Sequence, residues 1–264
     1  MELQLRGKHA LVTGSTGGIG LAIAKALAKE GAQIILNGRT AERVLNAAEA
    51  IRAEIPDAIL NSFVGDLSRA DRVDALAAEF THVDVLVNNL GVYGVKPFEE
   101  ITDADWNSII ETNFMSGLRL SRHYLPRMKK AGWGRIIFIS SESAANIPVE
   151  MIHYGVTKAM QVALSRGLAE TMQGTAVTVN SILAGPTRSE GVATFVKELA
   201  RSRNAPLDVV EKEFFQTARP TSLLQRFATV DEVASMVAYV ASPLSSATNG
   251  AALRVEGGLL RSIL

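Results

Sequence analysis

Short apolar runs alternate with longer stretches of helical spacing along most of this chain. The first run, His9 to Thr13, leads into a glycine-rich turn, a stretch of helical spacing over Leu21 to Glu30 and a second apolar run at Gln33 to Leu36. A strand, a turn, a helix and a second strand in this order form the βαβ unit of a parallel sheet. The beginning of the chain therefore predicts two neighbouring parallel strands joined by a helix.

The same alternation continues to the end of the chain. The pattern predicts further helices over Thr40 to Ile55, Ser68 to Phe80, about Asp103 to Lys130, Tyr154 to Met172 and Asp231 to Ala241. It predicts further strands over Ala58 to Val64, Val83 to Val87, Arg135 to Ser140, Ala176 to Ile182 and Ala251 to Val255. Since no linker-like stretch or short repeat divides the chain, we predict one α/β domain, 1–264, with a doubly wound, mainly parallel sheet and helices on both faces.

One segment, Leu183 to Ala228, departs from the alternation because it is long, polar and helix-prone. In a doubly wound fold, an insertion this late in the chain lies near the carboxyl ends of the strands, where ligands bind. We interpret the segment 183–228 as a cover over the substrate. A surface elaboration without a role in binding is the alternative.

Composition excludes several kinds of function. Lys+Arg and Asp+Glu both total 27, so the formally neutral chain has neither a nucleic-acid footprint nor a basic membrane surface. The absence of cysteine excludes disulfides and thiolate chemistry, and the four histidines show no metal-ligand spacing. The first residues lack the apolar core of a signal peptide, and no apolar run approaches the roughly 18 residues of a membrane span. We expect a cytoplasmic protein that binds no metal, nucleic acid or membrane.

The turn after the first strand carries four glycines, in the sequence Gly14-Ser15-Thr16-Gly17-Gly18-Ile19-Gly20. Glycines permit positive φ and a close approach of the backbone to a ligand. The free N–H groups at the start of the following helix favour an anion such as a pyrophosphate. We interpret this turn as a dinucleotide-binding loop, with tight packing of strand against helix as the alternative.

A second candidate is the pair Tyr154 and Lys158, which lie four residues apart on one face of a predicted helix. An ammonium near a phenol favours the phenolate, so the pair could give a tyrosine that exchanges a proton near neutral pH. The spacing alone is common, and a half-buried ring beside a solvated lysine is the alternative.

The order and spacing of these motifs resemble the short-chain dehydrogenase/reductase family. Its pattern T-G-x-x-x-G-x-G is met from Thr13 onward, and the resemblance covers nearly the whole chain, through Asp66-Leu67, Asn88-Asn89-Leu90-Gly91, Asn113, Ser141, Tyr154 with Lys158, and Val255-Glu256-Gly257-Gly258. Two departures are visible, since the family's N-N-A-G reads Asn88-Asn89-Leu90-Gly91 and its P-G after the sixth strand reads Ala184-Gly185-Pro186. The resemblance implies a Rossmann-type fold and an oxidoreductase that transfers a hydride between nicotinamide and a carbonyl or alcohol.

The same resemblance implies four catalytic residues, Asn113, Ser141, Tyr154 and Lys158. Tyr154 would be the general acid in reduction and the base in oxidation, while Lys158 would lower its pKa and hold the nicotinamide ribose. Ser141 would hydrogen-bond the substrate oxygen, and Asn113 would fix a water that links Lys158 to solvent. Taken singly, the asparagine could be a helix cap and the serine an ordinary loop hydroxyl.

Two neighbouring serines, Ser140 and Ser143, compete for the serine role. Ser141 is preferred because thirteen residues before the tyrosine is the family's usual offset. His153, beside Tyr154, would at most line a pocket wall, and a position on a loop surface is the alternative.

The choice of cofactor depends on the end of the second strand. An acidic side chain there would accept hydrogen bonds from the adenine ribose and repel a 2′-phosphate. Here the position is Gly38, followed by Arg39, whose guanidinium can pair with a phosphate. We predict NADP(H) rather than NAD(H), although Gly17 stands where many NADP-using relatives carry a second basic residue and Arg39 could be a solvated turn residue.

The resemblance implies a set of cofactor contacts, with Asp66 at the adenine amino group and Asn89 along the adenosine ribose. The whole set is Gly14, Ser15, Thr16, Gly18, Ile19, Gly20, Arg39, Asp66, Leu67, Asn89, Gly91, Tyr154, Lys158 and Thr187.

Two other functions remain open at this stage. One is a 3-oxoacyl-carrier-protein reductase, since an acidic carrier protein could bind the basic cluster of Arg122, Arg127, Lys129 and Lys130. The other is a non-catalytic NADP(H)-binding sensor. By resemblance we expect a homotetramer or homodimer acting on a small-molecule substrate. Its interface could include Leu259, Leu260, Ile263 and Leu264, unless this tail covers its own core.

Overall fold

A seven-stranded sheet lies at the centre of the molecule, and every neighbouring pair of its strands is parallel. The computed structural model describes residues 2–263, without the side chains at positions 195, 198 and 199. The strand order is β3-β2-β1-β4-β5-β6-β7. The strands are β1 (His9–Val12), β2 (Gln33–Gly38), β3 (Leu60–Val64), β4 (Val85–Asn88), β5 (Gly134–Ser141), β6 (Val177–Ala184) and β7 (Ala252–Val255). The predicted doubly wound sheet is confirmed, and it is parallel throughout.

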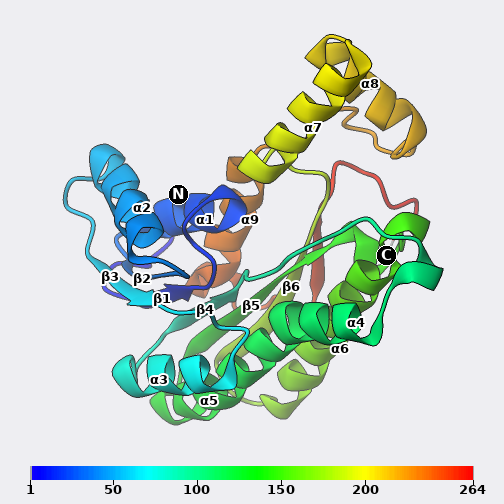
Figure 1. Cartoon of the computed structure of the whole chain (residues 1–264). Helices are drawn as coiled ribbons and strands as arrows, with labels where there is room; N and C mark the ends of the chain where they lie inside the picture. Colours follow the sequence, from blue (N-terminus) through cyan, green and yellow to red (C-terminus); the bar gives the residue numbers. More distant parts are fainter. Residues whose placement is uncertain (1, 264) are drawn as a thin grey trace.

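Helices cover both faces of the sheet, as Figure 1 shows. One face is covered by α1 (Gly18–Lys29), α2 (Ala41–Glu54) and α9 (Val230–Ala241). The other face is covered by α3 (Ala70–Glu79), α4 (Asp103–Ile110), α5 (Ser116–Ala131) and α6 (Ile152–Thr171). Because the sheet is covered on both sides, β4, β5 and β6 are buried along their whole length.

The stretch predicted as one helix over Asp103 to Lys130 is interrupted. A π-helical turn, Glu111–Met115, lies between α4 and α5. The capping box of Thr102 and Asp105 starts α4, and Gly132, with φ of 80°, ends α5. Apolar spacing does not reveal a π turn, because one added residue keeps the chain helical and only rotates the following face.

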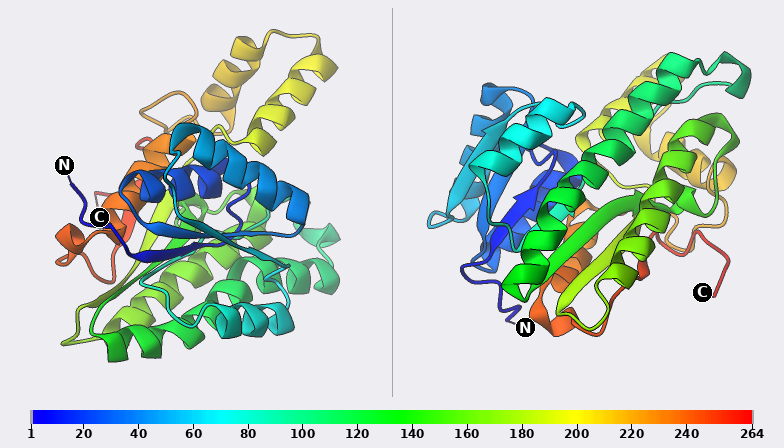
Figure 2. Two further views of the ribbon diagram at one scale, coloured as in Figure 1. Left: turned by 90° about the vertical axis from the view of Figure 1, so that its left-hand side faces the viewer. Right: turned by 90° about the horizontal axis from the view of Figure 1, so that it is seen from below.

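The late segment forms a hairpin of two helices, α7 (Glu190–Arg203) and α8 (Leu207–Thr217). Figures 1 and 2 show this hairpin standing away from the sheet and its helical layers. Its apolar cluster includes Val210, Phe215 and Phe227, which are separate from the two clusters that flank the sheet. The two ends of the hairpin segment lie side by side where they join the rest of the fold, since Thr187 pairs with Ala228 in an isolated parallel bridge. We call this junction the neck.

The topology separates the basic cluster from the edge where the strands end. The helix α5, which carries Arg122, Arg127, Lys129 and Lys130, ends at Ala131, and β5 begins at Gly134. These cations therefore lie toward the amino ends of the strands, opposite to the edge at which β5 delivers Ser141.

The C-terminal tail is divided between the core and the surface. Leu259 is 2% exposed and covers the core of its own chain, whereas Ile263 is 98% exposed. Leu264 lies outside the described residues. In the part of the chain that the structure describes, no helix is long and apolar enough to cross a membrane.

Candidate active site

A cavity of about 990 Å³ opens at the carboxyl ends of the strands. Its walls come from the glycine turn after β1, the ends of β2, β4, β5 and β6, the first turns of α6, and the helices α7 and α8. These segments are far apart in the sequence. The doubly wound topology brings them together, since the strand order reverses between β1 and β4 and leaves a crevice there.

The glycine turn is held closely by two asparagines. The Asn37 side chain accepts a hydrogen bond from the Gly14 N–H at 3.1 Å. The Asn89 amide donates to the carbonyls of Thr13 at 2.9 Å and Gly14 at 3.2 Å. A Cβ on Gly20 would lie 2.4 Å from the Gly14 carbonyl oxygen, which no real side chain tolerates. The glycine at position 20 is therefore required by a close approach of two backbones.

This turn fits an anionic cofactor group. The helix α1 begins after Gly17, whose extended backbone provides no side-chain cap. The first N–H groups of α1 therefore have no side-chain acceptor and face the cavity wall with the positive end of the helix dipole. Gly14, Thr16, Ile19 and Gly20 line the cavity.

Two of the predicted contacts in this turn lie outside the lining of the cavity among the described residues. Ser15 is fully buried and its hydroxyl accepts a hydrogen bond from the Asn37 N–H at 2.9 Å. Gly18 has φ of +53°, so it shapes the turn through its backbone. Ser15 and Gly18 therefore hold the shape of the glycine turn without facing the cavity.

The end of β2 leaves no room for an acidic side chain. A Cβ on Gly38 would lie 2.4 Å from Cγ2 of Thr16 and 2.9 Å from Cγ2 of Val44. Arg39 is exposed and lines the cavity. The structure adds Arg43, whose Nη2 is 3.8 Å from the Cβ position of Gly17. A second cation thus reaches the place where Gly17 itself provides none. In the sequence, the spacing of four residues between Arg39 and Arg43, across the start of a predicted helix, could have indicated this second cation.

The other predicted cofactor contacts line the same cavity: Asp66, Leu67, Asn89, Gly91, Tyr154, Lys158 and Thr187. The Asp66 carboxylate accepts hydrogen bonds from the N–H of Ser68 at 3.0 Å and from its hydroxyl at 2.8 Å. Thr187 donates its hydroxyl to the Gly185 carbonyl at 2.9 Å, which fixes the start of the late segment.

The catalytic candidates meet where β5 ends and α6 begins. Ser141 is the last residue of β5, and Tyr154 and Lys158 lie on the first turns of α6. The Lys158 Nζ lies 5.6 Å from the centroid of the Tyr154 ring and donates to the Ile139 carbonyl at 2.8 Å. These three side chains face one cavity, as the sequence predicts.

Burial controls the protonation of Tyr154 and Lys158. Desolvation raises the pKa of Tyr154, and Ser141 lowers it only in part, so the expectation of a tyrosine whose pKa is lowered toward neutral is wrong. Burial lowers the pKa of Lys158 to about 8. At neutral pH the tyrosine therefore holds its proton and the lysine its charge, which is the state that a proton donor requires.

The structure separates the three serines of the loop after β5. Ser140 donates its hydroxyl to the Lys158 carbonyl at 2.9 Å, and Ser143 donates to the neighbouring Glu142 at 2.9 Å. Ser141 also donates its hydroxyl to Glu142, and it is the one of the three that lowers the pKa of Tyr154. The expectation of a loop surface for His153 is wrong, because this residue is 6% exposed on α6 and packs against Trp106, with ring centroids 6.1 Å apart.

Asn113 lies behind the cavity, in the π-helical turn. Its side chain accepts from the Val92 N–H at 2.8 Å and donates to the Val92 carbonyl at 2.9 Å and to Thr157 at 3.1 Å. Its own carbonyl accepts from Gln161 at 2.5 Å, and Gln161 in turn accepts from the Lys158 Nζ at 3.3 Å. Asn113 is thus linked to Lys158 through Gln161.

Sequence reasoning missed Gln161. The available signal was its position three residues after Lys158, which places both side chains on one side of α6.

Two of the four histidines do come together, contrary to their sequence spacing. Ligand atoms of His9, His82 and Asp84 all lie within 4.8 Å of one another, at the edge where β1 and β4 begin. The carboxylate is already paired: it accepts from the His9 N–H at 2.9 Å and lies 3.7 Å from the Lys8 ammonium. The Asp84 carboxylate therefore already has a backbone donor and a cation beside it.

The family model for short chain dehydrogenases matches residues 8–200. This chain belongs to the short-chain dehydrogenase/reductase family. It is 45% identical to an uncharacterized oxidoreductase, YvaG, of Bacillus subtilis over the full length of both chains. It is 33% identical to the D-beta-hydroxybutyrate dehydrogenase of Cupriavidus necator, over 96% of this chain and 98% of the relative.

The fold of this short-chain dehydrogenase is also close to that of a solved relative. The crystal structure of L-sorbose reductase from Gluconobacter frateurii, complexed with NADPH and L-sorbose, superposes with a TM-score of 0.91. The two chains are 30% identical, and each is covered completely. The chain is thus an oxidoreductase of Rossmann-type fold, and one of its solved relatives is complexed with NADPH.

Proposed function

We propose that this chain is an NADP(H)-dependent carbonyl reductase or alcohol dehydrogenase in which Tyr154 exchanges the proton of the substrate oxygen. The observation that carries the proposal is the meeting of Tyr154, Lys158 and Ser141 at the wall of one cavity, which the glycine turn also lines, with the Lys158 Nζ 5.6 Å from the centroid of the Tyr154 ring. A nucleotide-binding sensor has no need for this arrangement.

When bound, the nicotinamide supplies or accepts the hydride. Tyr154 then donates its proton to the carbonyl oxygen in reduction and takes the proton from the hydroxyl in oxidation. Ser141 orients the same oxygen through its hydroxyl. Lys158 contributes a positive charge and a ribose contact, and Asn113 anchors the loop after β4 and holds the water that connects Lys158 to solvent.

The preference for NADP(H) follows from charge and space at the end of β2. Arg39 and Arg43 give that end of the cavity two cations, which suit a 2′-phosphate. The contact of a Gly38 Cβ with Thr16 excludes the acidic side chain that NAD(H) would favour. The NADPH in the L-sorbose reductase structure supports the same choice.

The proposed substrate is a small-molecule carbonyl compound or the corresponding alcohol. The segment 183–228 would cover it, since Val192, Val210 and Phe214 of the α7 and α8 hairpin line the cavity. The remote position of the basic cluster on α5 does not favour a carrier-protein substrate. We further propose a single-domain, cytoplasmic enzyme that forms a homotetramer or homodimer, as expected from the family.

The test is turnover on a defined panel. The panel contains L-sorbose, acetoacetate, acetoacetyl-N-acetylcysteamine and 2,3-butanedione, and oxidation of NADPH is followed by absorbance at saturating cofactor. We expect reduction of at least one compound, with one NADPH consumed per alcohol formed. Tight binding of NADPH without turnover of any compound or of the matching alcohols with NADP would favour the sensor.

Reversal of charge at Arg39 should change cofactor preference. We expect Arg39→Asp to weaken NADPH by about 100-fold and NADH by less than about threefold, because the lost phosphate contact is charge-assisted. Fluorescence titration with both cofactors measures the effect. Arg52→Asp, on the exposed side of α2, makes the same charge change away from the cavity and should alter neither affinity. Equal losses for the two cofactors would contradict the assignment.

The charge of Lys158 should determine the alkaline limit of the reaction. Because its pKa is about 8, the lysine is charged below that pH and neutral above it. The value of kcat/KM for NADPH, which reports on the free enzyme, should therefore fall as the pH rises through about 8. Lys158→Arg keeps its charge at any accessible pH, so the decline should move upward by more than one pH unit. If kcat/KM of Lys158→Arg falls at the same pH as that of the unaltered enzyme, the alkaline limit is set by another group.

A further inference from the structure

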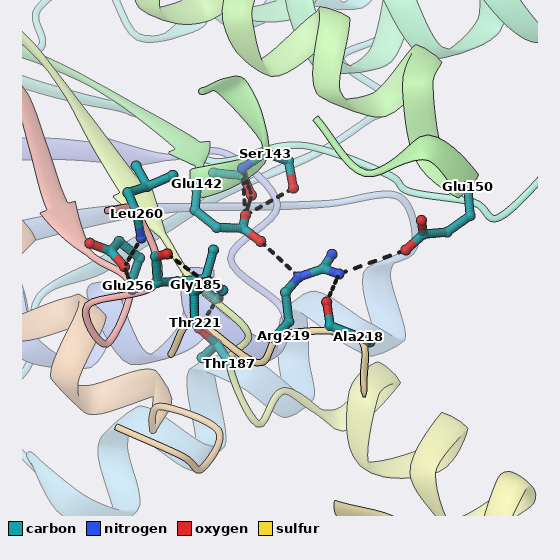
Figure 3. Close-up of polar contacts among 12 residues, drawn as sticks. Glu142, Ser143, Glu150, Gly185, Thr187, Ala218, Arg219, Thr221, Glu256 and Leu260 are labelled. Atoms are coloured by element: carbon teal, nitrogen blue, oxygen red, sulfur yellow. Dashed lines mark hydrogen bonds and ion pairs between the residues drawn. The ribbon is translucent and has the colours of Figure 1, made fainter. Parts of the chain in front are cut away.

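A buried ion pair connects the late segment to the catalytic loop. Arg219, which follows α8, places its Nε 3.3 Å from Oε1 of Glu142 and its Nη1 3.7 Å from Oε1 of Glu150. Figure 3 shows the guanidinium lying between the two carboxylates. The side chains of Arg219 and Glu142 are 13% and 4% exposed, so this pair is largely withdrawn from water.

Glu142 is in direct contact with the catalytic serine. Its second oxygen, Oε2, accepts the hydroxyl of Ser141. The same oxygen accepts the Ser143 N–H at 2.5 Å and the Ser143 hydroxyl at 2.9 Å. A carboxylate in a buried position requires such donors or an opposite charge, because its desolvation is otherwise very costly.

The contact with Glu142 competes with the role of Ser141. A serine hydroxyl carries one proton, which can be donated to Glu142 or to the substrate oxygen but not to both. When Ser141 turns to the substrate, Glu142 loses one of its donors. The carboxylate then depends on Ser143 and on the positive charge of Arg219.

We propose that Arg219 is a positioning residue that neutralises Glu142 and thereby releases the Ser141 hydroxyl to the substrate oxygen. The inference rests on the proposed function and extends it to two further residues of the cavity wall, Glu142 and Arg219. Arg219 belongs to the segment 183–228, so the placement of that segment over the cavity and the release of the serine become one event. A substrate bound beneath the hairpin therefore meets a Ser141 hydroxyl that is free to donate to its oxygen.

A double-variant cycle tests the proposal on the full chain. With the panel compound that the unaltered enzyme reduces fastest, Arg219→Gln should lower kcat about 30-fold, since a buried charge loses its partner. The NADPH dissociation constant should change by less than about twofold, because Arg219 acts on the serine and not on the cofactor. In Glu142→Gln, which has no charge to neutralise, the same Arg219→Gln change should cost less than about threefold.

Chemical rescue gives a readout that a purely structural role does not produce. Ethylguanidinium should raise the kcat of Arg219→Ala several-fold by restoring a cation beside Glu142. The matched control is Arg188→Ala, which removes the ion pair with Glu211 inside the same segment and leaves Glu142 untouched. This control should respond to ethylguanidinium by less than about 1.5-fold, a margin set by the screening of exposed pairs.

Each result decides between clear alternatives. If Arg219→Gln lowers kcat equally in the unaltered enzyme and in Glu142→Gln, Arg219 does not act through Glu142 and the proposal is overturned. It is also overturned if Arg219→Gln lowers kcat no more than Arg188→Gln does. If Arg219→Gln fails to fold by circular dichroism, Arg219→Ala takes its place in the same cycle, and Arg219→Lys, which keeps the charge, should retain most of kcat. Absence of turnover by the unaltered enzyme refutes the proposed function itself, whereas turnover with an uncoupled Arg219 refutes only this inference.

Discussion

Tyr154→Phe should lower kcat by about a thousandfold and leave NADPH binding unchanged within about twofold. The reason is that the change removes the proton donor and little else, and general acid catalysis contributes roughly 10²–10⁴ in rate. The ring, with its contact to Tyr93 at 6.4 Å between centroids, is retained. Initial rates of NADPH oxidation and a fluorescence titration of NADPH measure the two quantities.

The matched control is Tyr239→Phe, which removes a phenol from the outer part of α9, at 39% exposure and outside the cavity lining. It should retain full activity. If Tyr154→Phe keeps more than a tenth of the rate, the proton reaches the substrate oxygen from another group. Loss of NADPH binding together with the rate would instead mean that the variant disturbs the fold.

Gly20→Ala should abolish cofactor binding and destabilise the protein. The new methyl group would lie 2.4 Å from the Gly14 carbonyl oxygen and 2.5 Å from Nδ2 of Asn89. Both contacts are to the cradle itself, so the glycine turn must open. We expect a loss of about 2 kcal/mol in the free energy of unfolding, typical of overpacking, and a fall of about 100-fold in NADPH affinity. Urea unfolding and fluorescence titration measure them.

Gly167→Ala provides the control for this change. Gly167 lies on the exposed side of α6, and a Cβ there meets nothing within 4 Å. The same substitution should therefore stabilise the protein by about 0.5–1 kcal/mol through helix propensity. A Gly20→Ala variant that binds NADPH normally would show that the turn is not the cradle.

Most of the sheet was predictable because its buried strands are short and rich in apolar residues, and a glycine, proline or polar turn lies beside them. The strand β5, predicted to end at Ser140, extends to Ser141 in the structure. The π turn at Glu111–Met115 was not predictable, because it depends on the contacts of Asn113 with Val92 and Thr157 rather than on local spacing.

The candidate site was predictable where its chemistry follows from short motifs. Tyr154, Lys158 and the glycine turn each combine a residue type with a fixed local spacing. Arg219 has no such signal, since its partner Glu142 is remote in sequence and only the folded hairpin brings them together. For Arg43, the sequence predicts a place at the start of a helix. Its approach to Gly17 could not be predicted, because it depends on how α2 packs beside α1.

The neck of the late segment has a consequence for the evolution of this enzyme. The Arg188 N–H donates to the Ala228 carbonyl at 2.8 Å and the Ala228 N–H to the Pro186 carbonyl at 2.9 Å, so both ends of the hairpin are tied at one point. Insertions, deletions or replacement of the hairpin between these ends leave every strand of the sheet in register. Substrate range can therefore change with this hairpin, but under the proposed role of Arg219 each replacement has to bring a cation back to Glu142.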